Sequence, residues 1–180
     1  SINAKKFEKS LSNLINSNKI KSKDTVFLHV KLRNIKKKYN ISYKKISEII
    51  VECFKKKKIS NILVPTFYYS FSKTKKFDKN KTVSENGYFS EFFRKKYSTY
   101  RTNDPFFSVS HLKDKSKLYS KKKIDFNSSF KKQTIWQELL NSNITIINIG
   151  LDHLIITLIH YLEYECKVPY RAFFKRKGYK

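Results

Sequence analysis

The pattern of apolar and polar positions predicts four short strands. TVFLHV at 25–30 and ITIINIG at 144–150 are runs of β-branched and apolar residues, which are typical of buried strands. NILVPTF at 61–67 has the same character and contains Pro65, which would end a strand. FFSVS at 106–110 follows a proline and predicts a fourth strand.

Amphipathic periodicity predicts helices between these strands. Apolar residues recur at intervals of three and four in five segments, and each interval is the repeat of a helical face. Ser42 and Thr134 stand where a helix N-cap is expected. The predicted helices are residues 5–17, a segment that begins after Ser42, residues 88–97, a short segment after Thr134, and residues 154–166.

The order of these elements indicates an α/β fold. Strand 25–30, the helix after Ser42 and strand 61–67 form a strand–helix–strand unit of about forty residues, which implies parallel pairing. Residues 68–81 have no clear period, and long irregular segments inside compact domains are often functional loops. We therefore predict one domain, residues 1–180, with a central mixed sheet flanked by helices on both sides.

The last predicted helix carries the clearest candidate chemistry. Its apolar residues cover most of its surface, so we expect it to be buried, with Thr157, His160 and Glu163 on one narrow polar stripe. A histidine near neutral pKa beside a carboxylate suits proton abstraction, and Glu163 or Asp152 could supply that carboxylate. The spacing alone favours a plainer interpretation, a core histidine that bonds to its helix neighbours.

Charge changes the picture less than its size suggests. The chain has 40 basic and 14 acidic residues, a net charge of +26, which would suit nucleic acid. However, 35 of the basic residues are Lys and five are Arg, whereas base and phosphate recognition favour the planar fork of Arg. We favour a solvated lysine surface and keep a Lys-rich nucleic-acid-binding module as the alternative.

Several other site types are not expected. The four histidines and two cysteines do not have the spacing of a metal site, and three glycines cannot build a phosphate loop. Cys53 and Cys166 lie in apolar helical patterns, so we expect two packed free thiols. No apolar run is long enough to span a bilayer, and the first residues lack an apolar signal core. We expect a cytoplasmic protein without a membrane partner.

A series of short motifs resembles the aminoglycoside 3-N-acetyltransferase family. The family pattern has a His-Ser-Ser-Leu strand end, a Pro-Thr-Phe strand, a Ser-x-x-Gly turn, an Arg…His-Pro…Ser segment and a Thr-x-x-His-x-x-Glu helix. Each motif alone is weak, but they occur here in the same order across almost the whole chain. The matching segments are HVKL (29–32), PTF (65–67), FD (77–78), SENG (84–87), RTNDPFFSVS (101–110), IWQEL (135–139) and IGLDHLIITLIHYLE (149–163).

The resemblance implies a fold, a reaction and a set of site residues. It implies N-acetyl transfer from acetyl-CoA to an amine of an aminoglycoside or a related amino sugar, by direct attack and without a covalent enzyme intermediate. His160 matches the general base and Glu163 the carboxylate of the same motif. The remaining matches are His29, Val30, Lys31, Leu32 and Thr157 for acetyl-CoA, and Tyr68, Asp78 and Asp152 for the acceptor amine.

Three departures from the family pattern qualify these expectations. Val30-Lys31 replaces the Ser-Ser pair, and Asp104-Pro105 replaces the His-Pro pair. The family continues with further sheet and helix after the segment that matches VPYR (168–171), whereas this chain ends soon after it. This difference would fit a C-terminally truncated or inactive copy. A net charge of +26 disfavours polycationic antibiotics and favours an anionic acceptor, such as a nucleotide-linked amino sugar of polysaccharide biosynthesis. The sequence leaves the oligomeric state open.

Overall fold

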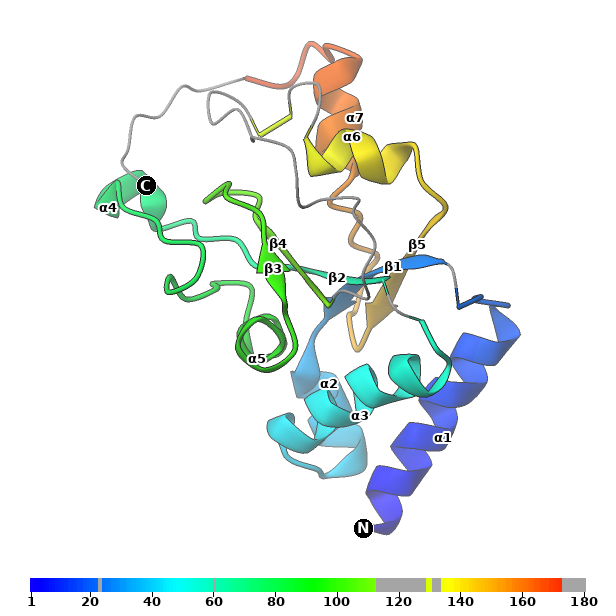
Figure 1. Cartoon of the computed structure of the whole chain (residues 1–180). Helices are drawn as coiled ribbons and strands as arrows, with labels where there is room; N and C mark the ends of the chain where they lie inside the picture. Colours follow the sequence, from blue (N-terminus) through cyan, green and yellow to red (C-terminus); the bar gives the residue numbers. More distant parts are fainter. Residues whose placement is uncertain (23, 60, 113–128, 131–133, 173–180) are drawn as a thin grey trace.

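A five-stranded mixed sheet organises the molecule (Figure 1). The computed structural model describes residues 1–22, 24–59, 61–112, 129–130 and 134–172. The strand order is β3-β4-β2-β1-β5. The strands are β1 (Thr25–Val30), β2 (Asn61–Pro65), β3 (Tyr100–Arg101), β4 (Val109–Leu112) and β5 (Ile144–Ile149).

Strand β1 pairs in parallel on both sides. Phe27 lies opposite Leu63 of β2 and opposite Ile146 of β5. The parallel pairing predicted from the strand–helix–strand unit is therefore confirmed. Strand β4 runs antiparallel to β2 and to β3, which makes the sheet mixed. The carboxyl ends of β1 and β5 meet at one edge of the sheet, where ligands gather in open α/β folds.

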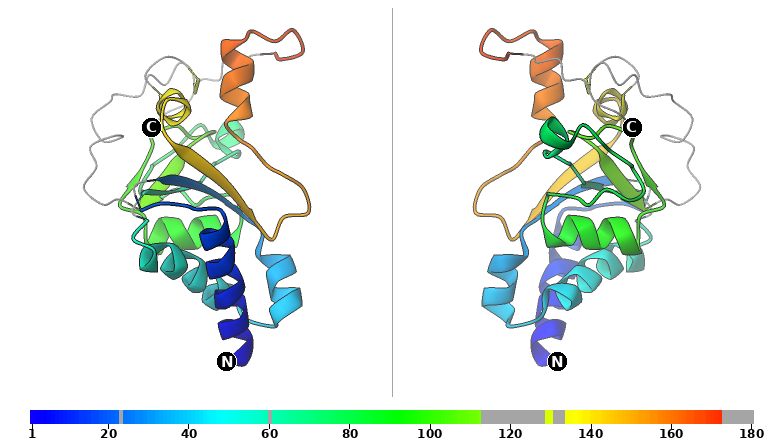
Figure 2. Two further views of the ribbon diagram at one scale, coloured as in Figure 1. Left: turned by 90° about the vertical axis from the view of Figure 1, so that its right-hand side faces the viewer. Right: turned by 90° about the vertical axis from the view of Figure 1, so that its left-hand side faces the viewer.

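Helices cover both faces of the sheet (Figure 2). One layer holds the four longer helices and the other holds two short helices, so the predicted fold class is confirmed. The first layer consists of α1 (Ile2–Ser17), α2 (Leu32–Tyr39), α3 (Tyr43–Lys56) and α5 (Tyr88–Lys96), and the second of α6 (Ile135–Leu140) and α7 (Ile159–Glu165). The short α4 (Phe71–Thr74) lies in the connection after β2.

Each layer packs through its own apolar cluster. The first is largely aliphatic and includes Val26, Ile46, Ile50 and Phe54, all fully buried. The second is rich in aromatic residues and centres on Trp136, whose ring lies 5.9 Å from that of Phe27. Aromatic packing on this second face sets the position of α7, which carries the candidate base.

One predicted helix cap is confirmed in the first layer, and one helix of that layer was missed; Thr134 precedes α6 but makes no side-chain cap hydrogen bond. Ser42 caps α3, because its hydroxyl accepts a hydrogen bond from the Lys45 amide. Helix α2 follows β1 almost directly, and its run of lysines masks the two buried positions, Leu32 and Ile35, that hold it to the core. With so few apolar residues, α2 gave too weak a periodicity to be predicted.

The prediction of a helix over 154–166 is wrong in its first third. Asn148 accepts a hydrogen bond from the Ile155 amide (2.9 Å) and donates one to the Ile155 carbonyl (3.1 Å). Residues 154–158 therefore form an irregular segment, here called the strap, between β5 and α7. Helix α7 begins only at Ile159. The predicted burial is also wrong here, since Leu154, Ile156 and Ile159 are exposed. Cys53 is buried as expected, but Cys166 is exposed.

The fourth predicted strand is displaced. Residues 106–108 are not extended, because the Asp104 carboxylate accepts hydrogen bonds from the amides of Phe106 (2.9 Å) and Phe107 (3.2 Å) and folds them into a turn. Strand β4 starts afterwards, at Val109. Within the described residues, no helix has the length and apolar character needed to cross a membrane.

Candidate active site

His160 and Glu163 form a pair on one face of α7, where the imidazole is partly exposed and the carboxylate is mostly buried. The His160 Nδ1 and Glu163 Oε2 atoms lie 3.2 Å apart, and the His160 side chain is 36% exposed. Positions three apart lie on one face of a helix, so α7 brings the two side chains together by its geometry alone. The imidazole meets the ring of Phe107 edge-on, with centroids 6.0 Å apart. A half-exposed ring against an aromatic wall can reach both solvent and a bound substrate.

Arg171 joins this pair from beyond the end of α7. Its Nε donates to Glu163 Oε2 (2.6 Å), and its Nη2 contacts the same oxygen and donates to His160 Nδ1 (2.6 Å). Burial opposes ionisation of Glu163, but the contacts with His160 and Arg171 outweigh it and hold the Glu163 pKa below its ordinary value. Glu163 is therefore a carboxylate at neutral pH.

His29 and Thr157, both expected to contact acetyl-CoA, lie together. His29 is the fifth residue of β1, and Thr157 lies on the strap that leads into α7. The His29 Nε2 and Thr157 Oγ1 atoms are 3.4 Å apart, and both side chains are buried. Burial lowers the pKa of His29 to about 4, so this ring is neutral near pH 7.

Lys31, Asn34 and Asp152 meet at the carboxyl ends of β1 and β5. Asp152 accepts hydrogen bonds from Lys31 Nζ and from Asn34 Nδ2, each 2.7 Å long. These hydrogen bonds and the Lys31 charge lower the Asp152 pKa. The three side chains border an open pocket of about 590 Å³, which Arg33, Lys36, Lys37, Asn40 and Tyr43 also line. Four cationic side chains make this pocket suited to an anion.

Gly150 allows this arrangement, because β5 and the start of α2 approach very closely. Its φ is +73°, and a Cβ at this position would lie 2.3 Å from the Lys31 carbonyl oxygen. The Lys31 amide donates to the Ile149 carbonyl (2.9 Å), and Asn34 donates to the Gly150 carbonyl (2.9 Å). The other two predicted residues of this segment, Val30 and Leu32, pack into the first-layer cluster.

Tyr68 and Asp78 lie in the connection between β2 and α5. The Tyr68 ring stacks on Phe77 with centroids 6.4 Å apart. Asp78 accepts from the amides of Asn80 (2.8 Å) and Lys81 (3.2 Å), and these bonds lower its pKa. Both residues thus hold a local turn, and Asp152 lies apart from them at the basic pocket.

Arg101 anchors that connection to the sheet. Its guanidinium is buried, donates to the carbonyls of Thr66 and Thr82 and stacks on Phe77 at 4.8 Å. Burial lowers the Arg101 pKa to about 10, which still leaves the side chain charged. The Arg expected from the family pattern therefore supports the loop that carries Tyr68 and Asp78.

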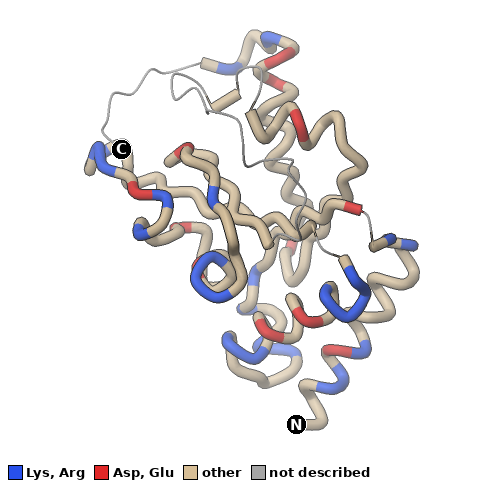
Figure 3. The backbone as a smooth tube through the Cα atoms, viewed as in Figure 1, with Lys and Arg blue, Asp and Glu red and all other residues tan. Residues whose placement is uncertain are grey.

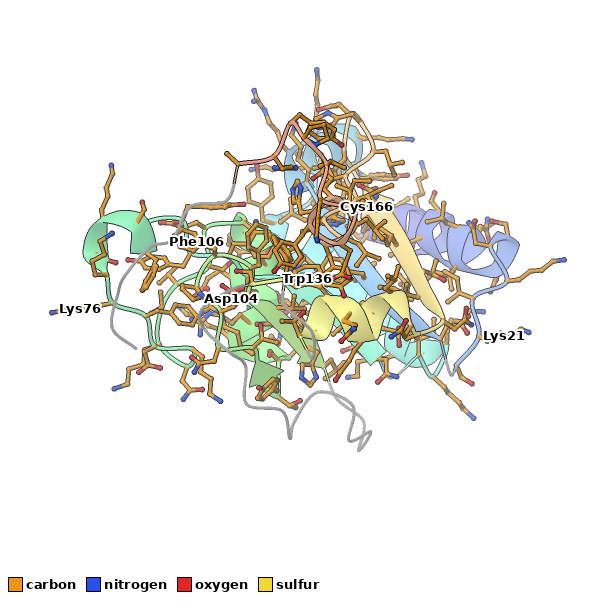
Figure 4. The ribbon with its side chains drawn as sticks, turned by 90° about the horizontal axis from the view of Figure 1, so that it is seen from above. Lys21, Lys76, Asp104, Phe106, Trp136 and Cys166 are labelled. Carbon is orange, nitrogen blue, oxygen red and sulfur yellow. The ribbon has the colours of Figure 1, made fainter. Side chains whose placement is uncertain are left out.

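A row of aromatic rings connects the two predicted parts of the site. Tyr69 contacts Phe67 (6.0 Å), Phe67 contacts Phe107 (5.2 Å), and Phe107 contacts His160. Figure 4 shows Asp104, Phe106 and Trp136 gathered at this centre when the molecule is seen from above. The turn that Asp104 caps sets Phe107 in place. This row gives His160 and the Tyr68 loop a common apolar wall.

Sequence patterns missed three residues of this region. Asn34 lies on the unpredicted helix α2, and Phe107 was expected in a strand. Arg171 follows the last apolar segment. The only sequence signal for its role was its position a few residues after the predicted helix that carries Glu163. Among the described residues, no group of three His, Cys, Asp or Glu side chains has a metal-binding arrangement.

Several solved structures share this fold. AAC-IIIb in a binary complex with CoASH superposes with a TM-score of 0.70 at 15% identity, over 87% of this chain and 64% of that chain. AAC-VIa bound to sisomicin gives 0.67 at 17% identity, over 87% of this chain and 63% of that chain. The YokD protein from Bacillus subtilis gives 0.72 at 16% identity, over 91% and 71%. The chain thus spans less than two thirds of the first two structures.

Sequence comparison identifies the family. No curated protein sequence matches the chain. In contrast, the profile described as aminoglycoside 3-N-acetyltransferase matches residues 48–179, a region that includes β2, the Tyr68 loop, β5 and α7. Because this match covers well over half of the chain, the chain belongs to the aminoglycoside 3-N-acetyltransferase family.

Proposed function

We propose that this protein transfers an acetyl group from acetyl-CoA to an amine of an amino sugar, with His160 as the general base. The observation that carries the proposal is the His160–Glu163 pair at 3.2 Å on a half-exposed helix, in a chain of this family. The family and the fold support acetyl transfer, and the pair supplies a proton acceptor beside an orienting carboxylate.

The proposed reaction is a direct attack on the thioester. With its Nδ1 proton donated to Glu163, His160 takes a proton from the neutral acceptor amine through Nε2. The amine nitrogen then bonds to the thioester carbonyl carbon while the carbon–sulfur bond breaks. CoA leaves as a thiolate, which takes up the proton that His160 removed. The products are an N-acetyl amine and CoA.

The basic pocket is our candidate for the phosphates of acetyl-CoA. Lys31, Arg33, Lys36 and Lys37 line it, and Asp152 lies there as a carboxylate between Lys31 and Asn34. A phosphate oxygen suits the same donors, because cationic and amide N–H groups at a helix start favour anions. The pantetheine arm would then pass His29 and Thr157 on its way to His160.

Local charge favours a cationic acceptor. Residues 134–166 contain Glu138, Asp152, Glu163 and Glu165 but no Lys or Arg, in a chain of +26. Figure 3 shows basic residues on the helices of the first layer, along the α4 connection and on the chain that leaves α7, whereas α6 and α7 themselves carry none. Screening over about 8–10 Å limits the reach of the distant charges, and the nearby Arg171 is paired with Glu163, so the carboxylates of this segment favour a cationic acceptor. We therefore favour a polycationic amino sugar over the anionic acceptor that the total charge suggests.

A thiol-release assay with acetyl-CoA and a panel of amino sugars tests the proposal. We expect CoA release only when an amine acceptor is present, with cationic aminoglycosides preferred over nucleotide-linked amino sugars. Calorimetric titration with CoA alone separates the remaining hypotheses. Binding without turnover would indicate an inactive member of the fold, and absence of CoA binding with salt-dependent binding to single-stranded DNA would favour the nucleic-acid module.

A further inference from the structure

Arg171 contacts the two atoms through which a catalytic His160–Glu163 pair would bind each other, His160 Nδ1 and Glu163 Oε2. Its Nη2 donates to His160 Nδ1 at 2.6 Å, and its Nε donates to Glu163 Oε2 at 2.6 Å. A guanidinium is always protonated and has no acceptor, so Arg171 is the donor in each contact. His160 Nδ1 is consequently an acceptor. A neutral imidazole that accepts through Nδ1 carries its proton on Nε2.

We propose that Arg171 is a positioning residue that sets the tautomer of His160 and keeps its proton on Nε2. The inference rests on the proposed function, in which Nε2 has to be free to take a proton and Nδ1–H has to donate to Glu163. With Arg171 in place, Nδ1 and Glu163 Oε2 face each other as two acceptors at 3.2 Å. Arg171 has to leave before His160 can act as a base.

The backbone after α7 delivers Arg171 to this position. Lys167 adopts a left-handed conformation (φ 50°), and the Val168 amide donates to the Glu163 carbonyl at 3.2 Å, so the chain turns back along the helix. The Arg171 amide then donates to the Val168 carbonyl at 3.3 Å. The two successive turns bring a residue eight positions after Glu163 beside it. Arg171 is thus held by the fold as well as by its charge.

The charged groups facing His160 are Glu163 on its own helix and Arg171 on the returning segment. From another element, the uncharged ring of Phe107 contacts the imidazole. Removal of the Arg171 donor therefore leaves Glu163 as the one charged partner for Nδ1. We expect the imidazole to respond by moving its proton to Nδ1, where it donates to Glu163.

Two-bond ¹H–¹⁵N spectra of protein labelled in histidine test this directly, without turnover. At about pH 8, above the ordinary imidazole pKa of about 6.5, the protonated and unprotonated ring nitrogens have distinct shifts. His160→Gln identifies the His160 signals among those of the four histidines. We expect the Nε2–H pattern in the native protein and a switch to the Nδ1–H pattern in Arg171→Met.

Arg33→Met is the matched control, because it removes the same charge from an exposed position in the basic pocket. Its His160 signals should stay as in the native protein. An Nδ1–H pattern in the native protein, an unchanged pattern in Arg171→Met, or an equal change in Arg33→Met would each overturn the inference. Thiol release reports separately on the proposed function. If Arg171→Met switches the tautomer but no protein shows turnover, only the acetyltransferase proposal is removed. If His160→Gln loses turnover but the tautomer is unchanged in Arg171→Met, only this inference is removed.

Discussion

His29 and Thr157 are separated by 128 positions in the sequence, yet the His29 Nε2 and Thr157 Oγ1 atoms lie 3.4 Å apart in the interior. The contact connects β1 to the strap that leads into α7. Because this link is made by a buried imidazole, protonation of one ring affects both the stability of the sheet and the placement of the helix that carries His160.

The first prediction concerns acid stability. Burial lowers the His29 pKa from 6.5 to about 4, so the unfolded chain binds a proton in this interval and the folded chain does not. Stability is therefore complete above pH 6.5 and falls as the pH drops toward 4, by about 3 kcal/mol in total for this residue. His29→Gln, which cannot titrate, should show a flatter dependence in denaturant unfolding measured across this range.

The control for His29 is His153, whose side chain is exposed. His153→Gln should keep the native dependence of unfolding free energy on pH. If His29→Gln and the native protein lose stability in parallel between pH 6.5 and 4, His29 is not the group that responds.

Removal of the candidate base should abolish most turnover. His160→Gln keeps the size of the side chain and loses the proton acceptor, and we expect a fall of at least about a hundredfold in the rate of CoA release. His153→Gln, seven residues earlier, should retain native turnover. CoA affinity should be nearly equal in all three proteins, since His160 acts on the amine. A native rate in His160→Gln would exclude it from the mechanism.

Lys31→Gln should weaken CoA binding. Loss of one charge-assisted contact to phosphate costs about 1.5 kcal/mol, or roughly a tenfold rise in the dissociation constant. The ion pair of Lys31 with Asp152 is exposed, so folding stability should change little. Lys21→Gln changes an exposed lysine that precedes β1 and should leave the affinity unchanged (Figure 4). Calorimetric titration at constant ionic strength compares the three proteins, and equal affinities would move the phosphate site elsewhere.

Gly150→Ala should destabilise the fold strongly. A methyl group would meet the Lys31 carbonyl at 2.3 Å and Ile35 at 2.9 Å, in a backbone conformation with positive φ. We expect a loss of about 2 kcal/mol or more. Gly87 also has a positive φ (+94°), but a Cβ added there would have no atom within 4 Å, so Gly87→Ala is the control. It should cost clearly less in thermal unfolding, and equal losses would mean that backbone strain alone is measured.

Short-range patterns determined much of the fold. Strands β1, β2 and β5 lie where runs of β-branched and apolar residues predicted them, because these residues suit the pleated surface of a sheet. Ser42 marked the start of α3 through a hydroxyl that needs only its neighbouring amides. The parallel pairing followed from the length of the connection between β1 and β2.

Other features depend on contacts that periodicity does not encode. The residues before Ile159 look helical by composition, but the Asn148 side chain binds the Ile155 backbone and holds them in a strap. In the same way the Asp104 carboxylate turns residues 106–108 out of the strand. One polar side chain in each case offers the backbone better partners than a helix or a sheet would.

The candidate site was predictable in part for the same reason. His160 and Glu163 are three residues apart on one helix, so spacing was enough to bring them together. Thr157 was expected on the same stripe but lies on the strap, and it meets His29 instead. Arg171 reaches the pair only because Lys167 reverses the chain, and neither spacing nor composition contains that reversal.

The two thiols differ in a way that makes the end of α7 open to direct observation. Cys166 is exposed at the C-cap of α7, whereas Cys53 is buried and its pKa is raised by that burial. A maleimide fluorophore or nitroxide should therefore attach at one position, three residues after Glu163, without any engineered substitution. Its signal would report when the segment that carries Arg171 departs from the helix as acetyl-CoA and an acceptor are added.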